Sequence, residues 1–307
     1  MDIINRIKDL EEQTVRNIKS SKSKNTIRAY KSDMLSFENF CKSLSLSYLP
    51  AEPKTISLFI TSMSNNCRKY STIKRKLAAI KVAHNLSGNY IDLKNPLINE
   101  NLISIKKQLG TFQKSKKPIL LHDLKMIISE IENEKSTNIK LRNKALILVG
   151  FAGAFRRSEL VSIEKNDLDF VKEGVKIFIK KSKTDQTGEG MFKAIPYLDN
   201  IDLCPVRSLN KWVEFITKDK KEVKKIFNLS DKSVALIIKK YVKKNGLDST
   251  RYAGHSLRSG FATTTADNGA DERQIMNMTG HKSSQMVRRY IHESNLFKNN
   301  ALKKIKL

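Results

Sequence analysis

Four short segments in the second half of the 307-residue chain contain side chains that could act together on a phosphate ester. In chain order they contribute Arg156, then Lys183, then His255 with Arg258, and finally His281 with Tyr290. Arginine forks bind the oxygens of a phosphate, histidine and lysine transfer protons, and a tyrosine phenol can attack phosphorus once its proton is removed. The set therefore has the residue types needed for nucleophilic cleavage of a phosphodiester.

Each segment taken alone has an ordinary structural explanation. The arginine before Ser158-Glu159-Leu160 can be a surface side chain or an ion-pair partner of the glutamate, and a lysine in a β-turn is usually solvated. A His-x-x-Arg pair is frequently a local polar contact, and a tyrosine on an amphipathic helix more often belongs to a core. It is the order of the whole set that indicates a common function.

That order resembles the tyrosine recombinase, or phage integrase, family. In this family an arginine, a β-hairpin lysine, His-x-x-Arg, Gly-His or Gly-Trp, and a tyrosine follow one another along the chain. The resemblance covers essentially the whole sequence, since the family also has a helical core-binding domain, a basic linker and a larger mixed catalytic domain. Among two-domain members the chain is similar to Cre recombinase, with no added module before residue 20 and with Pro50-Ala51-Glu52-Pro53 opening the second predicted helix. Cre differs in having a tryptophan at the Gly-His step.

The resemblance implies which side chains bind and attack the phosphate. Arg156, Arg258 and His281 would bind the non-bridging oxygens as negative charge builds on them. Tyr290 would attack phosphorus and form a 3′-phosphotyrosine, which conserves the energy of the broken bond. The family therefore implies a reaction without a cofactor, a metal or ATP.

The resemblance also implies how protons move. Lys183 would protonate the departing 5′-hydroxyl, and His255 would assist proton transfer and position the phosphate. Glu159, three residues after Arg156, would orient His255 or an arginine from behind.

Some of these positions have competitors in the sequence, and only the family's spacing decides between them. The competitors are Arg157 for Arg156, Lys180 and Lys181 for Lys183, and Tyr241 and Tyr252 for Tyr290.

The first 110 residues have apolar side chains at helical spacing and little strand signal. Stripes of this kind lie within 27–41, 56–63, 73–83 and 98–109. We therefore predict a helical core-binding domain of four to five helices over residues 1–110. Residues 111–118 combine three lysines with a proline and predict a basic linker, although a long surface loop inside one domain is the alternative.

The rest of the chain, residues 119–307, predicts a mixed catalytic domain. Alternation in Val175, Ile177 and Ile179 predicts a strand, and 192–198 is its expected partner. Helical patterns are expected near 122–134, 138–152, 206–217, 231–245, 256–268, 271–278 and 283–293. The predicted fold class is therefore mainly α with a small β-sheet, or α+β.

The formal net charge of +27 is shared between residues 1–117, with +13, and residues 118–307, with +14. Such a surplus favours a polyanionic partner, and together with the resemblance it predicts double-stranded DNA with inverted-repeat sites. A solvated lysine-rich face is the alternative for the basic helix near 68–81. The cations expected to contact DNA are Arg68, Lys69, Lys74, Arg75, Lys76, Lys81, Lys106, Lys107, Lys114, Lys116 and Lys117.

Three scattered cysteines form no CxxC pair, the N-terminus lacks a secretion-signal pattern, and no apolar run approaches the length of a membrane helix. We expect a cytoplasmic, DNA-associated protein of bacterial, phage or plasmid origin. Neither a membrane nor a small-molecule substrate is expected.

The last residues predict a short amphipathic helix over about 295–307. In the family such a tail docks into a neighbouring subunit and links a tetramer on DNA. Folding back onto its own domain is the alternative.

Taken together, these features predict a site-specific DNA recombinase, or integrase, encoded by a mobile element. A type IB topoisomerase or a telomere resolvase could use the same residues and is the main alternative. A DNA-binding regulator without catalysis is less compatible with the complete residue set.

Overall fold

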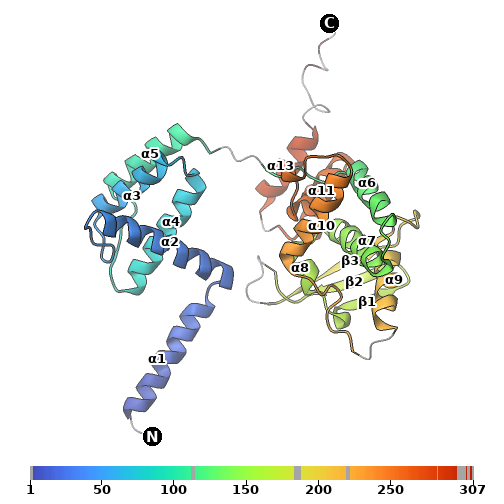
Figure 1. Cartoon of the computed structure of the whole chain (residues 1–307), viewed down its shortest axis with the longest axis horizontal. Helices are drawn as coiled ribbons and strands as arrows, with labels where there is room; N and C mark the ends of the chain where they lie inside the picture. The colour runs from blue at the N-terminus through green and yellow to red at the C-terminus, as the bar shows by residue number, and fades with distance from the viewer. Residues whose placement is uncertain are drawn as a thin grey trace. The chain divides into compact units, whose positions relative to one another are not determined.

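The computed structural model divides the chain into two compact units, Met1–Lys114 and Ser115–Leu307 (Figure 1). It describes residues 3–111, 115–182, 188–218, 222–281 and 283–295, together with Leu302 and Ile305.

The first unit contains the helices α1 (Ile3–Ser20), α2 (Lys24–Ser43), α3 (Pro53–Asn65), α4 (Tyr70–Leu86) and α5 (Pro96–Leu109). Local chemistry fixes several of the starting points: the Ser23 hydroxyl caps α2, the Asn95 side chain caps α5, and prolines open α3 and α5. The predicted apolar stripes meet in one core that includes Phe37, Phe59 and Ile80. The predicted helical domain is confirmed.

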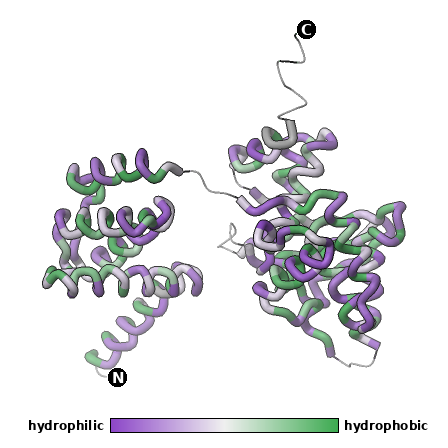
Figure 2. The backbone as a smooth tube through the Cα atoms, turned by 45° about the horizontal axis from the view of Figure 1, so that its top comes forward, coloured by the Kyte–Doolittle hydropathy of each residue, from purple (hydrophilic) through white to green (hydrophobic). Residues whose placement is uncertain are grey.

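Helix α1 is the element of the first unit that the sequence pattern did not predict. Its apolar side chains, from Ile3 to Ile18, are exposed. Figure 2 shows apolar and polar residues alternating along the helices of this unit.

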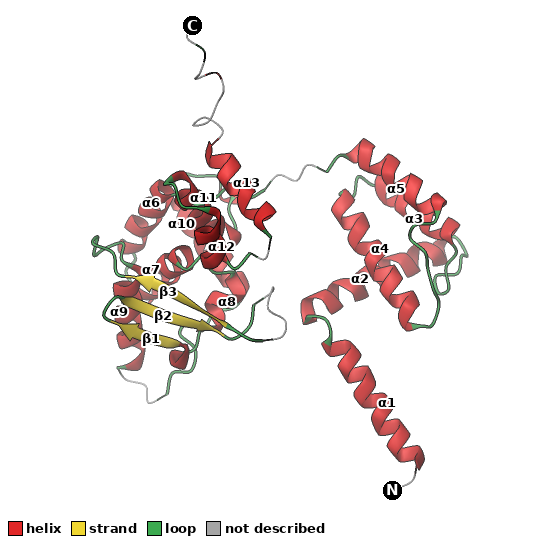
Figure 3. Ribbon diagram, turned by 180° about the vertical axis from the view of Figure 1, so that it is seen from behind, coloured by secondary structure: helices red, strands yellow, loops and turns green. Residues whose placement is uncertain are grey.

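The second unit contains a three-stranded antiparallel sheet of β1 (Leu168–Val171), β2 (Gly174–Ile179) and β3 (Met191–Pro196), in that order. Ile177 of β2 lies opposite Leu168 of β1 and Lys193 of β3. The sheet lies at one side of the helices (Figure 3). Those helices are α6 (Leu121–Glu132), α7 (Thr137–Ala152), α8 (Arg157–Ser162), α9 (Pro205–Thr217), α10 (Asp231–Lys244), α11 (His255–Asp267), α12 (Glu272–Thr279) and α13 (Ser284–Asn295).

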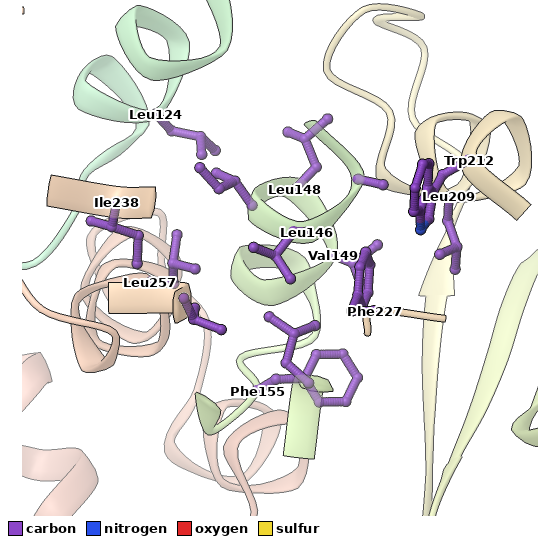
Figure 4. Close-up of a cluster of buried hydrophobic side chains, with 14 of the residues drawn as sticks. Leu124, Leu146, Leu148, Val149, Phe155, Leu209, Trp212, Phe227, Ile238 and Leu257 are labelled. Atoms are coloured by element: carbon purple, nitrogen blue, oxygen red, sulfur yellow. The ribbon is translucent and has the colours of Figure 1, made fainter. Parts of the chain in front are cut away.

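Helix α7 forms the centre of the second unit. Its residues from Ala145 to Val149 are all buried, among them Leu146 and Leu148, and they contact side chains of surrounding elements such as Leu257 and Phe227 (Figure 4). Because packing surrounds this helix, its C-terminal end is held in a fixed place. The segment that carries Arg156 follows directly from that end.

The end of the predicted linker is packed on the second unit. The Lys117 N–H donates to the Arg251 carbonyl at 2.7 Å, the Ile119 N–H donates to the Ser256 carbonyl at 2.9 Å, and Ile119 is fully buried. The α+β fold class is confirmed. No helix in the described ranges is both long enough and apolar enough to cross a membrane.

Candidate active site

Arg156 is held in place by Glu159 at the start of α8. The Glu159 carboxylate, 2% exposed, accepts one bond from the Arg156 backbone N–H at 2.9 Å and another from its guanidinium Nη1 at 2.6 Å. Arg156 Nη2 lies 3.5 Å from the Gly280 carbonyl and donates to it. The glutamate thus orients this arginine by hydrogen bonding to one edge of its guanidinium group.

Arg258 lies on α11 and is 1% exposed. Its Nη1 donates to the Ala154 carbonyl at 2.9 Å, while Nε and Nη2 have no hydrogen-bond partner within the described part of the chain. Burial, followed by the charge of Arg156, lowers the pKa of Arg258 to about 10. A buried cation with two unpaired donors is costly for the fold, and it is the arrangement expected of an anion receptor.

His281 follows α12, whose C-cap Gly280 adopts a left-handed φ of 62°. The His281 Nδ1 lies 2.8 Å from the Thr279 hydroxyl, which fixes the ring orientation. Burial and then the charges of Arg258 and Arg156 lower the pKa of His281 to about 4. The ring is therefore neutral at pH 7.

Tyr290 lies on α13 beside both histidines. Its hydroxyl is 3.4 Å from the His255 Nε2, and its ring stacks on the His281 ring with centroids 6.2 Å apart. Partial desolvation, then the charges of Arg258 and Arg156, lowers the pKa of His255. A neutral imidazole near a phenol can accept its proton, although the distance is long for a formed hydrogen bond.

Comparison with known proteins agrees with this geometry. The model of the phage integrase family matches residues 119–296, and that of the phage integrase N-terminal SAM-like domain matches residues 15–85. The chain belongs to the phage integrase family. An integrase/recombinase XerD homolog of Selenomonas ruminantium is 42% identical over 302 residues, covering 94% of this chain and 88% of the relative. A tyrosine recombinase XerC of Staphylococcus aureus is 26% identical, and the match covers 89% of this chain and 87% of the relative.

Two solved structures have the same fold. A Tn1549 transposon integrase in complex with transposon right end DNA gives a TM-score of 0.64 at 16% identity, covering 92% of this chain and 93% of the other. A XerH site-specific recombinase bound to a palindromic difH substrate gives a TM-score of 0.62 at 17% identity, covering 91% of this chain and 80% of the other. The chain is a site-specific DNA recombinase of the tyrosine type, and nothing in these comparisons supports the topoisomerase or resolvase alternative.

The structure places the recombinase's two arginines, two histidines and tyrosine around one point, whereas Lys183 lies outside the described residues. Of its competitors, Lys180 forms ion pairs with Glu164 at 2.5 Å and Asp167 at 2.9 Å. Lys181 is exposed. The assignment of Lys183 therefore stays a prediction.

The competing tyrosines are buried, and their hydroxyl groups bond to residues that are not among the predicted site residues. Tyr241 is fully buried and accepts a hydrogen bond from the Asn143 amide at 2.8 Å. Tyr252 is 1% exposed and donates to Asp123 at 3.2 Å. Their hydroxyl groups serve the core of the catalytic unit.

Several predicted DNA-contacting cations already have partners inside their own unit. Arg75 forms an ion pair with the buried Asp33 at 2.9 Å, and Lys76 lies over the Phe59 ring. Lys116 donates to the Thr250 carbonyl, and Lys117 lies over the Tyr252 ring. The remainder are exposed or half-buried, except Lys114, which is outside the described ranges. Within those ranges, no three His, Cys, Asp or Glu side chains gather as a metal site would need.

Lys193, which is 3% exposed, was not among the predicted site residues. A lysine in a strand is usually solvated, so its residue type gave no signal. Its position in the strand did give a signal, because Lys193 and the buried Ile195 are two residues apart and so face the same side of β3.

The free energy of unfolding of the DNA-free recombinase is expected to fall as the pH is lowered from 7 to 5. The pKa of His281 is about 4 when folded and about 6.5 when unfolded, so the unfolded chain binds the proton first. The stability that the neutral His281 contributes is complete above pH 6.5 and is lost as the pH falls toward 4. It amounts to at most about 3 kcal/mol. Urea unfolding at both pH values should show a smaller loss for His281→Asn than for the wild type. An equal loss would contradict the low pKa.

Proposed function

We propose that the recombinase cleaves and rejoins DNA through Tyr290, which forms a 3′-phosphotyrosine bond. The observation that supports this proposal is the buried guanidinium of Arg258, whose Nε and Nη2 have no hydrogen-bond partner in the described part of the chain, together with a tyrosine hydroxyl that faces a neutral histidine. A protein that only bound DNA would gain nothing from burying this charge, because exposed cations bind phosphates equally well.

In the proposed reaction, Arg258 and Arg156 bind the non-bridging oxygens of the scissile phosphate. Both guanidiniums are held before DNA binds, Arg258 by the Ala154 carbonyl and Arg156 by Glu159. Little reorganisation is then needed as negative charge develops on the five-coordinate phosphorus. His281 donates a further hydrogen bond from its ring.

The proton steps complete the reaction. The Tyr290 hydroxyl gives its proton to His255 as its oxygen bonds to phosphorus, and the bond from phosphorus to the 5′-oxygen breaks. We assign the proton that the 5′-oxygen gains to Lys183. The 5′-hydroxyl of a second strand then attacks the phosphotyrosine, and the tyrosine is released.

We further propose duplex sites made of inverted repeats around a short spacer, bound by both units. The exposed cations around α4, including Arg68, Lys69 and Lys74, support phosphate contacts by the first unit. The XerH structure, a relative in fold, was solved on a palindromic substrate.

Covalent capture tests the proposed function. The protein is incubated with sheared and nicked DNA from the cells that encode it, and fragments that stay attached in SDS are sequenced. Fragments sharing one pair of inverted repeats are expected, and Tyr290→Phe should yield none. Relaxation of supercoiled plasmids that lack the recovered sequence would instead indicate a topoisomerase.

We also propose a homotetramer on DNA, joined by the C-terminal segment, most of which lies outside the described residues. The apolar Leu302 and Ile305 are about 60% exposed, which is consistent with a segment that packs on another subunit. Removing residues 296–307 should leave binding to a single half-site within about twofold while abolishing the tetramer, as measured by mass photometry on the recovered duplex. An equal loss of half-site binding and of tetramer formation would contradict docking between subunits.

A further inference from the structure

Lys193 is a buried ionisable side chain of the catalytic unit. It lies in β3 with its side chain on the core face, and it is 3% exposed. Lysine is almost never this buried unless it is paired, because removing its ammonium group from water is costly. Within the described ranges, no carboxylate lies within ion-pair distance of Lys193. A reason for the buried charge must therefore come from its other contacts.

The ammonium group joins two segments that are far apart in the sequence. Its Nζ donates to the Gly153 carbonyl at 2.6 Å and to the Met278 carbonyl at 2.7 Å. It also lies 4.6 Å from the centre of the Phe155 ring, a favourable cation–π geometry.

Each of the two bonded carbonyls belongs to a segment that carries proposed phosphate ligands. Gly153 precedes Ala154, whose carbonyl binds Arg258, and leads into Arg156. Met278 lies in the last turn of α12, directly before the Thr279 and Gly280 that orient His281 and contact Arg156. Lys193 thus ties the arginine-bearing turn to the histidine-bearing turn.

The charge of Lys193 also acts on the site. Burial lowers its pKa to about 7, with Glu159 opposing this shift and Arg258 and Arg156 adding to it. Lys193 is in turn among the charges that lower the pKa of His281. These mutual effects place its ammonium within electrostatic reach of the residues proposed to bind phosphate.

We propose that Lys193 is a positioning residue for DNA cleavage, which fixes the separation between Arg156 and His281 through its two carbonyl bonds. The proposal rests on the proposed function, since it concerns the same phosphate. Anchoring of the sheet is a weaker explanation, because β3 is already paired with β2 along its whole length. A methionine would fill the same space without donating either bond.

The first part of the test needs no DNA. The pKa of His281 is followed by NMR of the histidine ring carbons in wild type, Lys193→Met and the control Lys176→Met. The control removes one exposed lysine from the neighbouring strand β2. The pKa of His281 should rise in Lys193→Met and stay unchanged in Lys176→Met. An unchanged His281 signal in Lys193→Met would overturn the proposal.

The second part measures single-turnover formation of the covalent adduct on the captured duplex. Lys193→Met should cleave roughly 100-fold more slowly, the order expected when reacting groups are misplaced by about 1 Å. Its affinity for the duplex should stay within about twofold, because Lys193 is too buried to contact DNA directly. Lys176→Met should match the wild type in both respects.

The outcomes separate the two proposals. If Lys193→Met cleaves at the wild-type rate, or loses affinity and rate together, Lys193 does not position the ligands. If the wild type forms no adduct on any fragment, the proposed function fails, while the NMR comparison still decides whether Lys193 is coupled to His281. Lys193→Leu serves as a second apolar variant if the methionine variant does not fold.

Discussion

Replacing Tyr290 by phenylalanine is expected to abolish the covalent protein–DNA adduct, lowering its rate of formation by at least about 10⁴-fold. The substitution removes one oxygen, and that oxygen lies 3.4 Å from the His255 Nε2. The ring should keep its stacking on His281, so the fold and the affinity for duplex DNA should stay close to wild type. The measurement is the rate at which the captured duplex becomes attached to protein in SDS gels, together with a binding titration.

The matched controls are Tyr241→Phe and Tyr252→Phe, which remove the same oxygen from the two competing tyrosines. Tyr252→Phe loses its hydrogen bond to Asp123, and Tyr241→Phe loses the bond from Asn143 and an interaction with Glu134, so each should cost about 1 kcal/mol of stability or more. Both should still form the adduct. If Tyr290→Phe forms it while either control does not, the nucleophile has been assigned to the wrong tyrosine.

Replacing Arg258 by methionine should have opposite effects on catalysis and on stability. Loss of a preorganised donor to the phosphate should slow adduct formation by about 10²- to 10³-fold or more. The same change removes a buried cation that has two unpaired N–H groups, at the cost of one hydrogen bond to the Ala154 carbonyl. We therefore expect the Tm of the DNA-free protein to be equal to or higher than that of the wild type.

Arg251→Met is the control for this comparison, because Arg251 is an exposed arginine. It should change neither the Tm nor the rate of adduct formation. A clear fall in Tm for Arg258→Met without a loss of cleavage would show that Arg258 serves the fold. Loss of DNA affinity without slower cleavage of bound duplex would show that it is only a DNA contact.

The elements predicted correctly are those whose pattern is local. The stripe within 56–63 became α3, and the alternation of Val175, Ile177 and Ile179 became β2, because each pattern alone determines which side is buried. Among the missed elements, α1 is a helix of 18 residues, whereas α8 and β1 are short. Helix α8 has six residues and β1 has four, which is too few for a periodic signal.

For the site, the sequence predicted which residue types belong together but not how they are supported. The choice between His255 and an arginine as the partner of Glu159 was left open, and the structure shows Arg156. The depth of Arg258 depends on packing between α7 and α11, which no local pattern reveals, and the carbonyl partners of Lys193 lie in segments distant from it in the sequence. A resemblance in motif order predicts ligands of the phosphate, whereas their supporting bonds are visible only once distant segments are brought together.

The most direct test of the central claim is to identify the atom that carries the DNA. The captured adduct is trimmed with nucleases, digested with trypsin and sequenced by tandem mass spectrometry. We expect a nucleotide joined through its 3′-phosphate to Tyr290 and to no other residue. A nucleotide attached to any other side chain, or joined through a 5′-phosphate, would contradict it.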